Sequence, residues 1–586
     1  METILDLGDY TFPAVLKNSL KKFAERQALS LVGGKTVTYA EMGARAAQIS
    51  QFLLALGLKP YCKIAIFGTG RPEWGQSYFA IVNTGMIAVP LLPDFSETEV
   101  EAILKHCEVD GLIVEDRLWQ KIKGLDEYIL PKVVIKLDDL SLIKGDSTIR
   151  IEAERQNFSA EENAQFAIDF FSKYEVREED TVSIIYTSGT TGRSKGVELT
   201  HRNLVWTAVQ GQTMHRVNKM DRCLSFLPLS HVYEFTIGFT MQVMNGSCVY
   251  YLGKPPVVSA LLPAFLKVQP TIICSVPLIM EKIYKNKVLP AFSKNKFVKM
   301  IYRIRPFQIL LHRIAGSQLK KTFGGHVVFF GIGGAKMDTA VEKFLKDAKF
   351  PYAIGYGLTE SSPLLAGSGP RITLPGTIGP VMEGVDLRIL DPDPKTGIGE
   401  VVARGRNIMK GYYKAPDLTA ASFTTKNDSC GEGFLKTGDL GTLKKKKGLV
   451  RLSLKGRSKN MILGPSGENI YPEDIEFVLN QHPLVSESLV VEDDAGLVAL
   501  VQVDEEKLEE EAKNRLAKMA GEFARDIAYQ KEAILSEIQY FVNSKVNKNS
   551  RVGKVRKVEK FEKTASQKIK RYLYDLRSKV TGKKNK

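Results

Sequence analysis

The chain has 586 residues, of which 44% are hydrophobic and 25% are charged. At roughly 100 to 200 residues per domain, this length predicts several folding units and excludes a small binding module, while the composition excludes a disordered or fibrous protein. Lys and Arg outnumber Asp and Glu by 82 to 66, and the formal charge of +16 suggests an anionic partner without identifying it.

The first 150 residues of the chain alternate between helical and strand patterns. Its opening sequence, METILDLGDY, has no apolar core followed by a cleavage site, so it does not predict a secretory signal. Ala40–Leu56 has helical spacing, and Lys63–Phe67 is a short apolar strand. Trp74–Asn83 then predicts a helix and Met86–Leu92 a strand. Such alternation predicts an α/β fold with βαβ units in mainly parallel sheets.

The most apolar long stretch of the chain is Cys223–Leu252. Because His231, Glu234 and Asn245 interrupt it, the stretch predicts a buried strand and helix rather than a membrane span. The six cysteines lack the spacing of a disulfide framework or a zinc site, which favours reduced thiols. We therefore expect a cytoplasmic protein.

The pattern changes in the last third of the chain. Short strands separated by tight turns predict a small β-rich subdomain at about 376–455. A Gly/Arg/Ser/Lys segment follows, and we place a domain boundary there, with an N-terminal domain at 1–457 and a C-terminal domain at 458–586. In the second domain, 505–546 predicts a long amphipathic helical stretch that is broken at most once.

The sharpest local signal is the segment YTSGTTGRSKGV at 186–197, which follows an apolar run. Small residues let backbone amides approach phosphate oxygens, and hydroxyls and Lys195 add further donors, so the segment predicts a phosphate cradle. It is not a Walker A loop, because Ser194 and Gly196 flank the lysine where that motif requires Gly and Ser or Thr. The alternative is an ordinary glycine-rich hairpin turn.

This segment resembles the signature loop of the adenylate-forming superfamily, which contains acyl-CoA synthetases, firefly luciferase and the adenylation domains of peptide synthetases. Ser194 replaces the Pro that is usual in the family. Other segments resemble the family's remaining motifs in the same order: LPLSHVYE at 227–234, GIGGA at 331–335, YGLTES at 356–361, GEVVARGRNIMKGYY at 399–413, TGD at 437–439, GRSK at 456–459, GENIYPEDIE at 467–476 and KTASQKIKR at 563–571. The resemblance spans nearly the whole chain. It implies a large N-terminal domain of two mainly parallel βαβ sheets with a small β-barrel subdomain, followed by a small mobile α+β domain.

The resemblance also implies a reaction in which ATP converts a carboxylate into an acyl adenylate that a thiol then attacks. Its implied nucleotide site falls into four groups. The β- and γ-phosphates would meet Thr187, Ser188, Gly189, Thr190, Thr191, Gly192 and Lys195, and the α-phosphate would meet Thr359. Mg²⁺ would be held by Thr187 and Glu360, since a hard cation takes oxygen ligands. The adenine would lie against Gly333, Gly334, Ala335, Tyr356 and Gly357, and the ribose would meet Asp439 and Arg457.

Two further groups are implied to serve catalysis. His231 would help to orient the carboxylate, although a histidine beside an apolar run is by default a core residue. Lys568 would reach the active site during adenylation and stabilise developing charge, although a lysine in a basic run is by default solvated. Gln567 stands where the family usually has Gly, and we interpret it as a subfamily mark.

The resemblance further implies a rotation of the C-terminal domain between the two half-reactions. Lys459 matches the hinge. The thiol-step face would contain Gly467, Glu468 and Asn469.

The motif LPLSHVYE and the pair Glu73–Trp74 resemble long-chain acyl-CoA synthetases. Ala260–Phe265 and Ile272–Ile283 would then contribute apolar lining for the acyl chain. CoA is the expected thiol co-substrate, and a related acyl-ACP synthetase that uses holo acyl carrier protein is the alternative. A non-catalytic binding protein on the same fold is a remote third reading. Nucleic acid is not expected as a partner, because the basic residues lack interleaved aromatics in a recognised module.

The positive charge is concentrated in two segments. Lys282–Lys321 contains 11 basic and no acidic residues, and Arg551–Lys586 also carries a net +11, which leaves −6 for the rest of the chain. Solvated helix faces explain such runs in general. The alternative for Lys282–Lys321 is peripheral contact with an anionic membrane, which would place the enzyme at the inner face of that membrane, or contact with an acidic acceptor.

Overall fold

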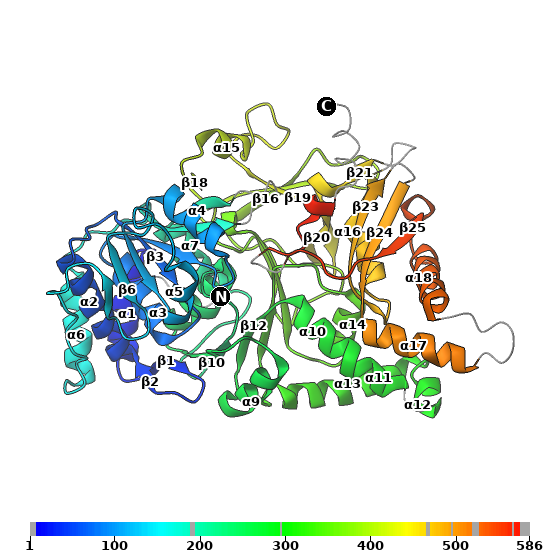
Figure 1. The fold of residues 1–586 in the computed structure, drawn as a ribbon, viewed down its shortest axis with the longest axis horizontal. Coiled ribbons are helices and arrows are strands. Elements are labelled where there is room, and N and C mark those ends of the chain that lie inside the picture. Colours follow the sequence, from blue (N-terminus) through cyan, green and yellow to red (C-terminus); the bar gives the residue numbers. More distant parts are fainter. Residues whose placement is uncertain are drawn as a thin grey trace.

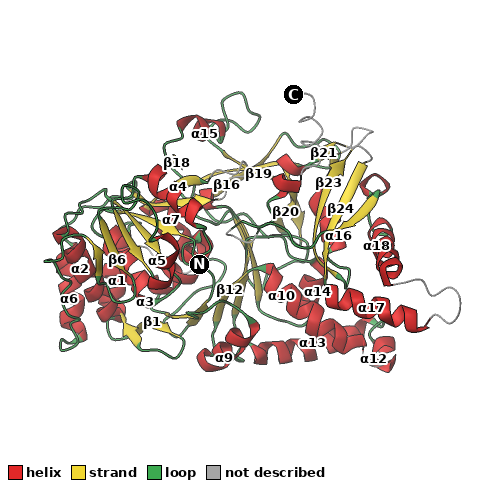
Figure 2. Cartoon of the chain, in the orientation of Figure 1, coloured by secondary structure: helices red, strands yellow, loops and turns green. Residues whose placement is uncertain are grey.

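The computed structural model describes residues 7–187, 194–293, 296–463, 469–493, 496–518, 527–564 and 568–574. Figure 1 shows the early part of the chain on one side and the strands and helices of the last 120 residues on the other. Figure 2 shows strands inside both parts with helices around them. The architecture is α/β, as predicted.

Two eight-stranded sheets form the large N-terminal part. The first has the order β15 (Ala366–Ser368), β14 (Tyr352–Tyr356), β13 (Phe329–Ile332), β12 (Ile272–Ser275), β10 (Arg222–Ser225), β11 (Cys248–Tyr251), β1 (Gln27–Leu31) and β2 (Thr36–Thr38). The second has the order β18 (Gly411–Tyr412), β9 (Lys195–Thr200), β8 (Thr181–Thr187), β4 (Ile87–Leu91), β3 (Lys63–Phe67), β5 (Gly111–Val114), β6 (Val133–Lys136) and β7 (Leu142–Lys144). Their central strands are parallel, and antiparallel pairs close both edges of each sheet.

The sheets are layered because successive residues of a strand point to opposite faces. Ile64 and Ile66 enter a core shared by both sheets, whereas Ala65 and Phe67 enter a second core. The shared core holds buried residues of α1 (Phe12–Phe23), α2 (Tyr39–Ala55), α3 (Pro72–Val82) and α7 (His201–Gly211). The second core holds α4 (Glu97–Cys107) and α5 (Asp116–Ile122), and α6 (Ala160–Phe171) packs beside α2.

The outer face of the first sheet carries a third core. It contains buried residues of α9 (Val258–Val268), α10 (Pro277–Ile283), α13 (Arg305–Thr322) and α14 (Thr339–Asp347). Between α10 and α13 lie η2 (Tyr284–Val288), α11 (Leu289–Ser293) and α12 (Lys296–Ile301). The stretch 223–252 forms β10, the π-helix η1 (Glu234–Thr240), α8 (Met241–Met244) and β11, so the prediction of a buried strand and helix is confirmed.

The β-rich subdomain is a four-stranded antiparallel sheet in the order β16 (Val385–Leu390), β17 (Gly399–Gly405), β19 (Leu435–Lys446) and β20 (Leu449–Arg457). We expected a small barrel, but β16 and β20 do not pair with each other among the described residues. One face of the sheet packs on Tyr356 and Leu365, and the other is covered by Cys430 and Phe434, so neither face needs closure to be buried.

The last part of the chain has its own core. Strands β23 (Val485–Asp493), β24 (Gly496–Val503) and β25 (Lys554–Lys557) pack on α16 (Pro472–Leu479), α17 (Glu505–Lys518) and α18 (Ile527–Asn543). The long helical stretch predicted at 505–546 is therefore α17 and α18. Connecting pieces are α15 (Pro416–Ala421), η3 (Thr359–Ser361), η4 (Ser458–Asn460), β21 (Ile462–Leu463), β22 (Asn469–Ile470), η5 (Lys548–Ser550) and η6 (Arg571–Tyr574).

Two general properties of the described chain bear on its surroundings. None of the helices in the described ranges is long and apolar enough to cross a membrane. All six cysteines are free thiols.

Candidate active site

The predicted phosphate loop lies at the tip of the hairpin formed by β8 and β9. Thr187 pairs with Lys195 at the last rung of this antiparallel ladder, so the loop leaves and re-enters the sheet at one point. Gly196 follows directly, and a Cβ there would lie 2.9 Å from Ile184. The predicted loop residues Ser188, Gly189, Thr190, Thr191 and Gly192 lie outside the described residues.

A tyrosine links Lys195 to Glu360. Strand β18 pairs with β9, which places the Tyr412 ring 5.1 Å from Lys195 Nζ. The Tyr412 hydroxyl donates a hydrogen bond of 2.8 Å to Glu360 Oε1. Burial and the charge of Glu360 raise the pKa of Tyr412, so its hydroxyl remains a donor. Tyr412 was not predicted as a site residue, although it lies within the quoted segment 399–413.

Glu360 stands on a tight turn after β14. Gly357 opens this turn, and a Cβ there would lie 1.5 Å from the Pro363 carbonyl oxygen, so glycine is required. The turn continues as the 3₁₀ helix η3, which contains Thr359 and Glu360, both partly exposed. The Met409 amide donates to the Glu360 carbonyl at 2.9 Å. The turn thus presents one threonine hydroxyl and one carboxylate beside the β8–β9 hairpin, whose strand β9 contacts η3.

The segment Gly333–Ala335 forms the loop after β13. Gly333 is buried against Tyr233. A Cβ at position 333 would lie 3.3 Å from the nearest atom of the Tyr233 ring. Gly334 has φ +86°, which favours glycine, and it is exposed together with Ala335. The loop therefore has an exposed surface formed mostly by backbone, which suits a flat ring. The supporting role of Tyr233 was not predicted.

The predicted ribose residues are joined to one another. The Tyr356 hydroxyl donates to Asp439 Oδ2 at 2.9 Å, and Arg457 Nε lies 3.0 Å from Asp439 Oδ1. Asp439 and Arg457 face each other across β19 and β20. Burial raises the pKa of Asp439, while Arg457, the Tyr356 hydroxyl and Lys568 oppose that rise.

His231 lies shortly before η1 and is partly exposed. Its Nδ1 accepts a hydrogen bond of 3.3 Å from the Tyr233 amide, which leaves the proton of the neutral ring on Nε2. Burial, and then the positive charge of Lys568, lower the pKa of His231 to about 4. His231 is therefore uncharged at neutral pH. Glu234, in the same motif, is fully buried, and burial raises its pKa to about 8.

Lys568 comes from the last part of the chain and faces this site. Its ammonium interacts with the charges of Arg457, Asp439 and Glu360 and acts on His231. The side chain keeps contact with solvent, yet enough protein surrounds its ammonium that desolvation lowers its pKa; Arg457 lowers it further, and Asp439 and Glu360 oppose the shift. The structure thus brings Lys568 to residues that lie more than 100 positions earlier in the chain.

The remaining predicted residues lie at the junction of the two parts. Lys459 is exposed on η4, directly after β20. Asn469 is exposed on β22 and forms no hydrogen bond with the other described site residues. Gly467 and Glu468 lie outside the described residues.

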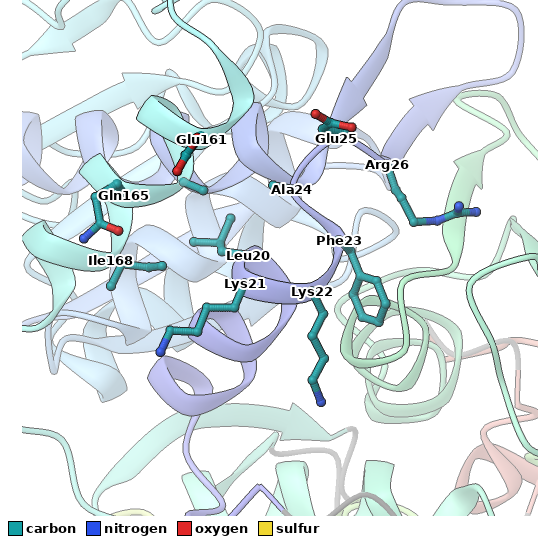
Figure 3. A pocket seen from close by; sticks show the side chains of 11 residues that line it. Leu20, Lys21, Lys22, Phe23, Ala24, Glu25, Arg26, Glu161, Gln165 and Ile168 are labelled. Atoms are coloured by element: carbon teal, nitrogen blue, oxygen red, sulfur yellow. The ribbon is translucent and has the colours of Figure 1, made fainter.

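A cavity elsewhere in the molecule does not contain the site. It has a volume of about 410 Å³ and lies beside α1, where Lys21, Lys22 and Arg26 surround it (Figure 3). None of the predicted site residues lines it. In the described ranges, no three His, Cys, Asp or Glu side chains are grouped so that they could hold a metal.

Residues 16–413 match the family described as AMP-binding enzyme. The chain belongs to this family. The match includes the hairpin of β8 and β9, His231, the loop after β13, Glu360 and Tyr412, whereas Asp439, Arg457 and Lys568 lie beyond it.

Curated relatives match over most of this chain. It is 28% identical over 533 residues to the long-chain-fatty-acid–CoA ligase FadD15 of Mycobacterium bovis, covering 85% of this chain and 82% of the relative. It is 27% identical to long chain acyl-CoA synthetase 3 of Arabidopsis thaliana, covering 92% and 82%. It is also 27% identical to fatty acyl-CoA synthetase A of Dictyostelium discoideum, covering 80% and 72%.

Solved structures share the fold over nearly the full length. ATP-bound MatB from Rhodopseudomonas palustris has a TM-score of 0.74 at 21% identity, covering 98% of this chain and 100% of that one. The o-succinylbenzoate coenzyme A synthetase MenE of Bacillus subtilis, in complex with ATP and magnesium ion, has a TM-score of 0.70 at 22% identity, covering 95% and 98%. The fold predicted from the sequence motifs is confirmed.

Proposed function

We propose that this protein is an AMP-forming ligase that joins a long-chain fatty acid to CoA. The observation that carries the proposal is the bonded group of Tyr356, Asp439 and Arg457, on which the charge of Lys568 acts from the other side of the predicted domain boundary. The names of the curated relatives support the long-chain fatty acid and CoA as substrates.

In the first half-reaction, a carboxylate oxygen of the fatty acid attacks the α-phosphorus of ATP, and the bond to pyrophosphate breaks. The hairpin of Thr187 and Lys195, with the predicted loop Ser188–Gly192, would hold the β- and γ-phosphates. Thr359 would donate to the α-phosphate. Lys568 would stabilise the charge that develops between the carboxylate and the α-phosphate.

The base and sugar would be held by the two connected groups beside this centre. Asp439, already bonded to Tyr356 and Arg457, would accept the ribose hydroxyls. The adenine would lie on the backbone of Gly333, Gly334 and Ala335, with Tyr356 and Gly357 at its edge. Neutral His231 would donate through Nε2 to the carboxylate without adding a competing charge.

The residues beside the phosphate loop fit Mg²⁺. This ion is usually held in proteins by one or two carboxylates together with substrate phosphates rather than by a cage of protein ligands. Glu360 supplies one carboxylate, oriented by Tyr412, and Thr187 supplies an oxygen at the loop edge. When bound, Mg²⁺ would neutralise phosphate charge and so favour pyrophosphate as the leaving group.

In the second half-reaction, the thiolate attacks the acyl carbonyl, and AMP leaves. We propose a domain boundary between 457 and 458, with Lys459 as the hinge about which 458–586 rotates. Lys568 then leaves the site, and the face with Gly467, Glu468 and Asn469 replaces it. Separate cores on the two sides of η4 support this division.

The acyl chain would enter beside β12 and α10, as expected for Ile272–Ile283. The contact of the Tyr233 ring with the loop after β13 places an aromatic wall next to His231 in this region. Leu261 and Phe265 of α9 lie in the core behind the same sheet, which supports a contribution of Ala260–Phe265 to the wall rather than to the opening.

The experiment that tests the proposal supplies ATP, Mg²⁺ and palmitate with either CoA or holo acyl carrier protein, and detects the thioester by mass spectrometry. Palmitoyl-CoA is the expected product. Product with the carrier protein alone would favour the acyl-ACP synthetase instead. No product with either acceptor across chain lengths, together with no pyrophosphate exchange, would support the non-catalytic alternative.

We also propose that the outer face of α13 contacts an anionic membrane. Phe307, Leu310 and Ile314 lie three and four residues apart on this helix and are 47%, 53% and 60% exposed, opposite the buried His312 and Leu319. The neighbouring Met300 and Ile304 are also exposed. Basic residues of the same segment that make no ion pair with another described residue are Lys282, Lys287, Lys299, Arg303, Arg313, Lys320 and Lys321. An apolar stripe with basic flanks suits an interfacial helix.

Co-sedimentation with vesicles of phosphatidylcholine, with and without phosphatidylglycerol, tests this contact. We expect binding that requires the anionic lipid and that falls in Leu310→Ser/Ile314→Ser. Tyr128→Ser removes an exposed aromatic residue elsewhere and is the matched control. Equal sedimentation of all three proteins would contradict the membrane contact.

A further inference from the structure

Lys285 of η2 extends from the N-terminal part to the end of a helix in the C-terminal part. Its Nζ donates to the backbone carbonyls of Val485 and His482 at 2.6 and 2.8 Å, and lies 3.5 Å from that of Asn480. These carbonyls follow the last residue of α16. Asn480 is the C-cap of α16, whereas His482 lies in the turn that follows and Val485 begins β23, so an ammonium group with three donors suits this cluster of carbonyls.

Lys336 contacts the first two turns of the same helix. Its Nζ lies 2.8 Å from Asp474 Oδ1 and 5.3 Å from the centroid of the Phe477 ring. Lys336 follows directly after Gly333–Ala335, the loop on which the adenine would lie. The nucleotide loop and α16 are therefore connected through a single residue.

Helix α16 is in turn connected to Lys568. Glu476 Oε1, in the middle of α16, lies 2.6 Å from Arg571 Nη2, and Arg571 Nη1 donates to the Val490 carbonyl at 2.8 Å. Arg571 stands three residues after Lys568. The position of α16 thus constrains the segment that carries the lysine.

We propose that Lys285 and Lys336 are positioning residues that dock α16 and thereby hold Lys568 in the site during adenylation. The inference rests on the proposed function. A rotation about Lys459 carries α16 away from the N-terminal part, so both contacts must break before the thiol step. The two lysines therefore favour the first half-reaction and contribute nothing to the second.

The size of the effect is bounded by the exposure of these contacts. The Lys336 and Asp474 side chains are 38% and 42% exposed, and ion pairs at such positions are weak. Lys285 is more enclosed, and this desolvation lowers its pKa. The charge of Lys507 lowers the pKa further, while Asp504 and Glu281 oppose the shift. We therefore expect the loss of Lys285 to lower pyrophosphate exchange more than the loss of Lys336 does.

The test measures the half-reactions separately, with pyrophosphate exchange for the first and thioester formation from synthetic palmitoyl adenylate and CoA for the second. We expect Lys285→Ala to lower the exchange kcat by about 5- to 20-fold and Lys336→Ala by about 3-fold, magnitudes typical of single charge-assisted hydrogen bonds and exposed ion pairs. The second half-reaction should remain within a factor of two of the wild type, on the order of the scatter between surface variants.

The chain offers matched controls. Lys17→Ala and Lys343→Ala remove the same charge from exposed positions of the N-terminal part and should leave both half-reactions unchanged. Lys285→Arg should recover most of the exchange activity. The exchanged pair Lys336→Asp/Asp474→Lys should exceed either single variant.

The outcomes separate three explanations. Equal losses in both half-reactions, or losses that follow a fall in Tm, would show a merely structural role and overturn the inference. Exchange at the wild-type level in Lys285→Ala/Lys336→Ala would also overturn it. Absence of exchange in the wild type would instead overturn the proposed function.

Discussion

The walls of the proposed nucleotide site and the segment that carries Lys568 are stabilised in different ways. Asp439 and Glu360 stand on strands and turns of the N-terminal part. Asp439 is bonded to the buried Tyr356, and Glu360 is bonded to the partly buried Tyr412. Lys568 lies on an irregular segment, where its amide donates to Thr564 Oγ1 and its side chain reaches solvent. The first group is oriented before any ligand binds, whereas the second depends on how a whole domain is docked.

This difference suits a two-step reaction. Groups that hold AMP are needed in both half-reactions, so orienting them in advance is useful throughout. In the proposed mechanism, the cation that stabilises attack on the α-phosphate is needed only once, and it withdraws before the thiol enters. Variants that each remove one group from one of the two regions test this difference.

The largest effect should come from Lys568→Ala. Loss of the charge beside the reacting oxygen should lower pyrophosphate exchange by roughly 10²- to 10³-fold. Thioester formation from synthetic palmitoyl adenylate should stay near the wild-type rate, because Lys568 has left the site by then. A comparable fall in both half-reactions would instead indicate that Lys568 stays in the site throughout, as proposed for Asp439 and Glu360.

Asp439→Asn should have the next largest effect. It removes the charge that pairs with Arg457 and weakens acceptance of the ribose hydroxyls, so kcat/KM for ATP should fall by about 10- to 100-fold. Because AMP is bound throughout, both half-reactions should be impaired, in contrast to Lys568→Ala. Isothermal titration with AMP should show the same weakening, and unchanged AMP affinity would contradict the ribose assignment.

Tyr412→Phe should have a smaller effect. It removes only the hydroxyl that orients Glu360, so we expect a fall of about 3- to 10-fold in kcat/KM for ATP. The Mg²⁺ concentration needed for half-maximal exchange should rise at the same time. Tyr413→Phe, one residue away on the same segment, is the control, and an identical response in both variants would argue against an effect through Glu360.

The smallest effect should be a shift in the titration of His231. Its pKa of about 4 in the folded protein lies below the ordinary 6.5, so the unfolded state binds more protons between these values and stability falls as pH decreases through that window. Lys568 is the second cause of the shift, after burial. Lys568→Met should therefore raise the pKa of His231 slightly, measured by NMR with His231→Gln for assignment. An unchanged pKa would place Lys568 away from His231.

The sequence predicted the parts of the site that lie within ordered motifs. TGD and GRSK placed Asp439 and Arg457 at the ribose, and YGLTES placed Tyr356 at the adenine; the structure joins all three residues by hydrogen bonds. Tyr412 lies within a motif named in the sequence analysis. Its residue type alone does not show whether its hydroxyl orients another side chain or its ring only packs in the core. Lys285 was interpreted only as one of eleven charges, because its partners are backbone carbonyls of another domain and carry no sequence signature.

The fold was predictable to a similar extent. Residue alternation indicated α/β layers, and Tyr39–Ala55 and Lys63–Phe67 differ from the predicted elements by at most one residue at either end. Where a barrel was expected, the strands form an open sheet. The segments that cover Leu387 and Val402 on its two faces are distant in the sequence, and strand patterns do not reveal them.

The pairing of β1 with β11 has a consequence for synthesis on the ribosome. Leu29 pairs in parallel with Val249, so strand β1 has no such neighbour until more than 200 further residues are made. At about 5 to 20 residues per second, this interval lasts roughly 10 to 45 s. During that time an apolar strand edge is available to other nascent chains. Production of this protein should therefore benefit from slower initiation or added chaperone more than from any change at its nucleotide site.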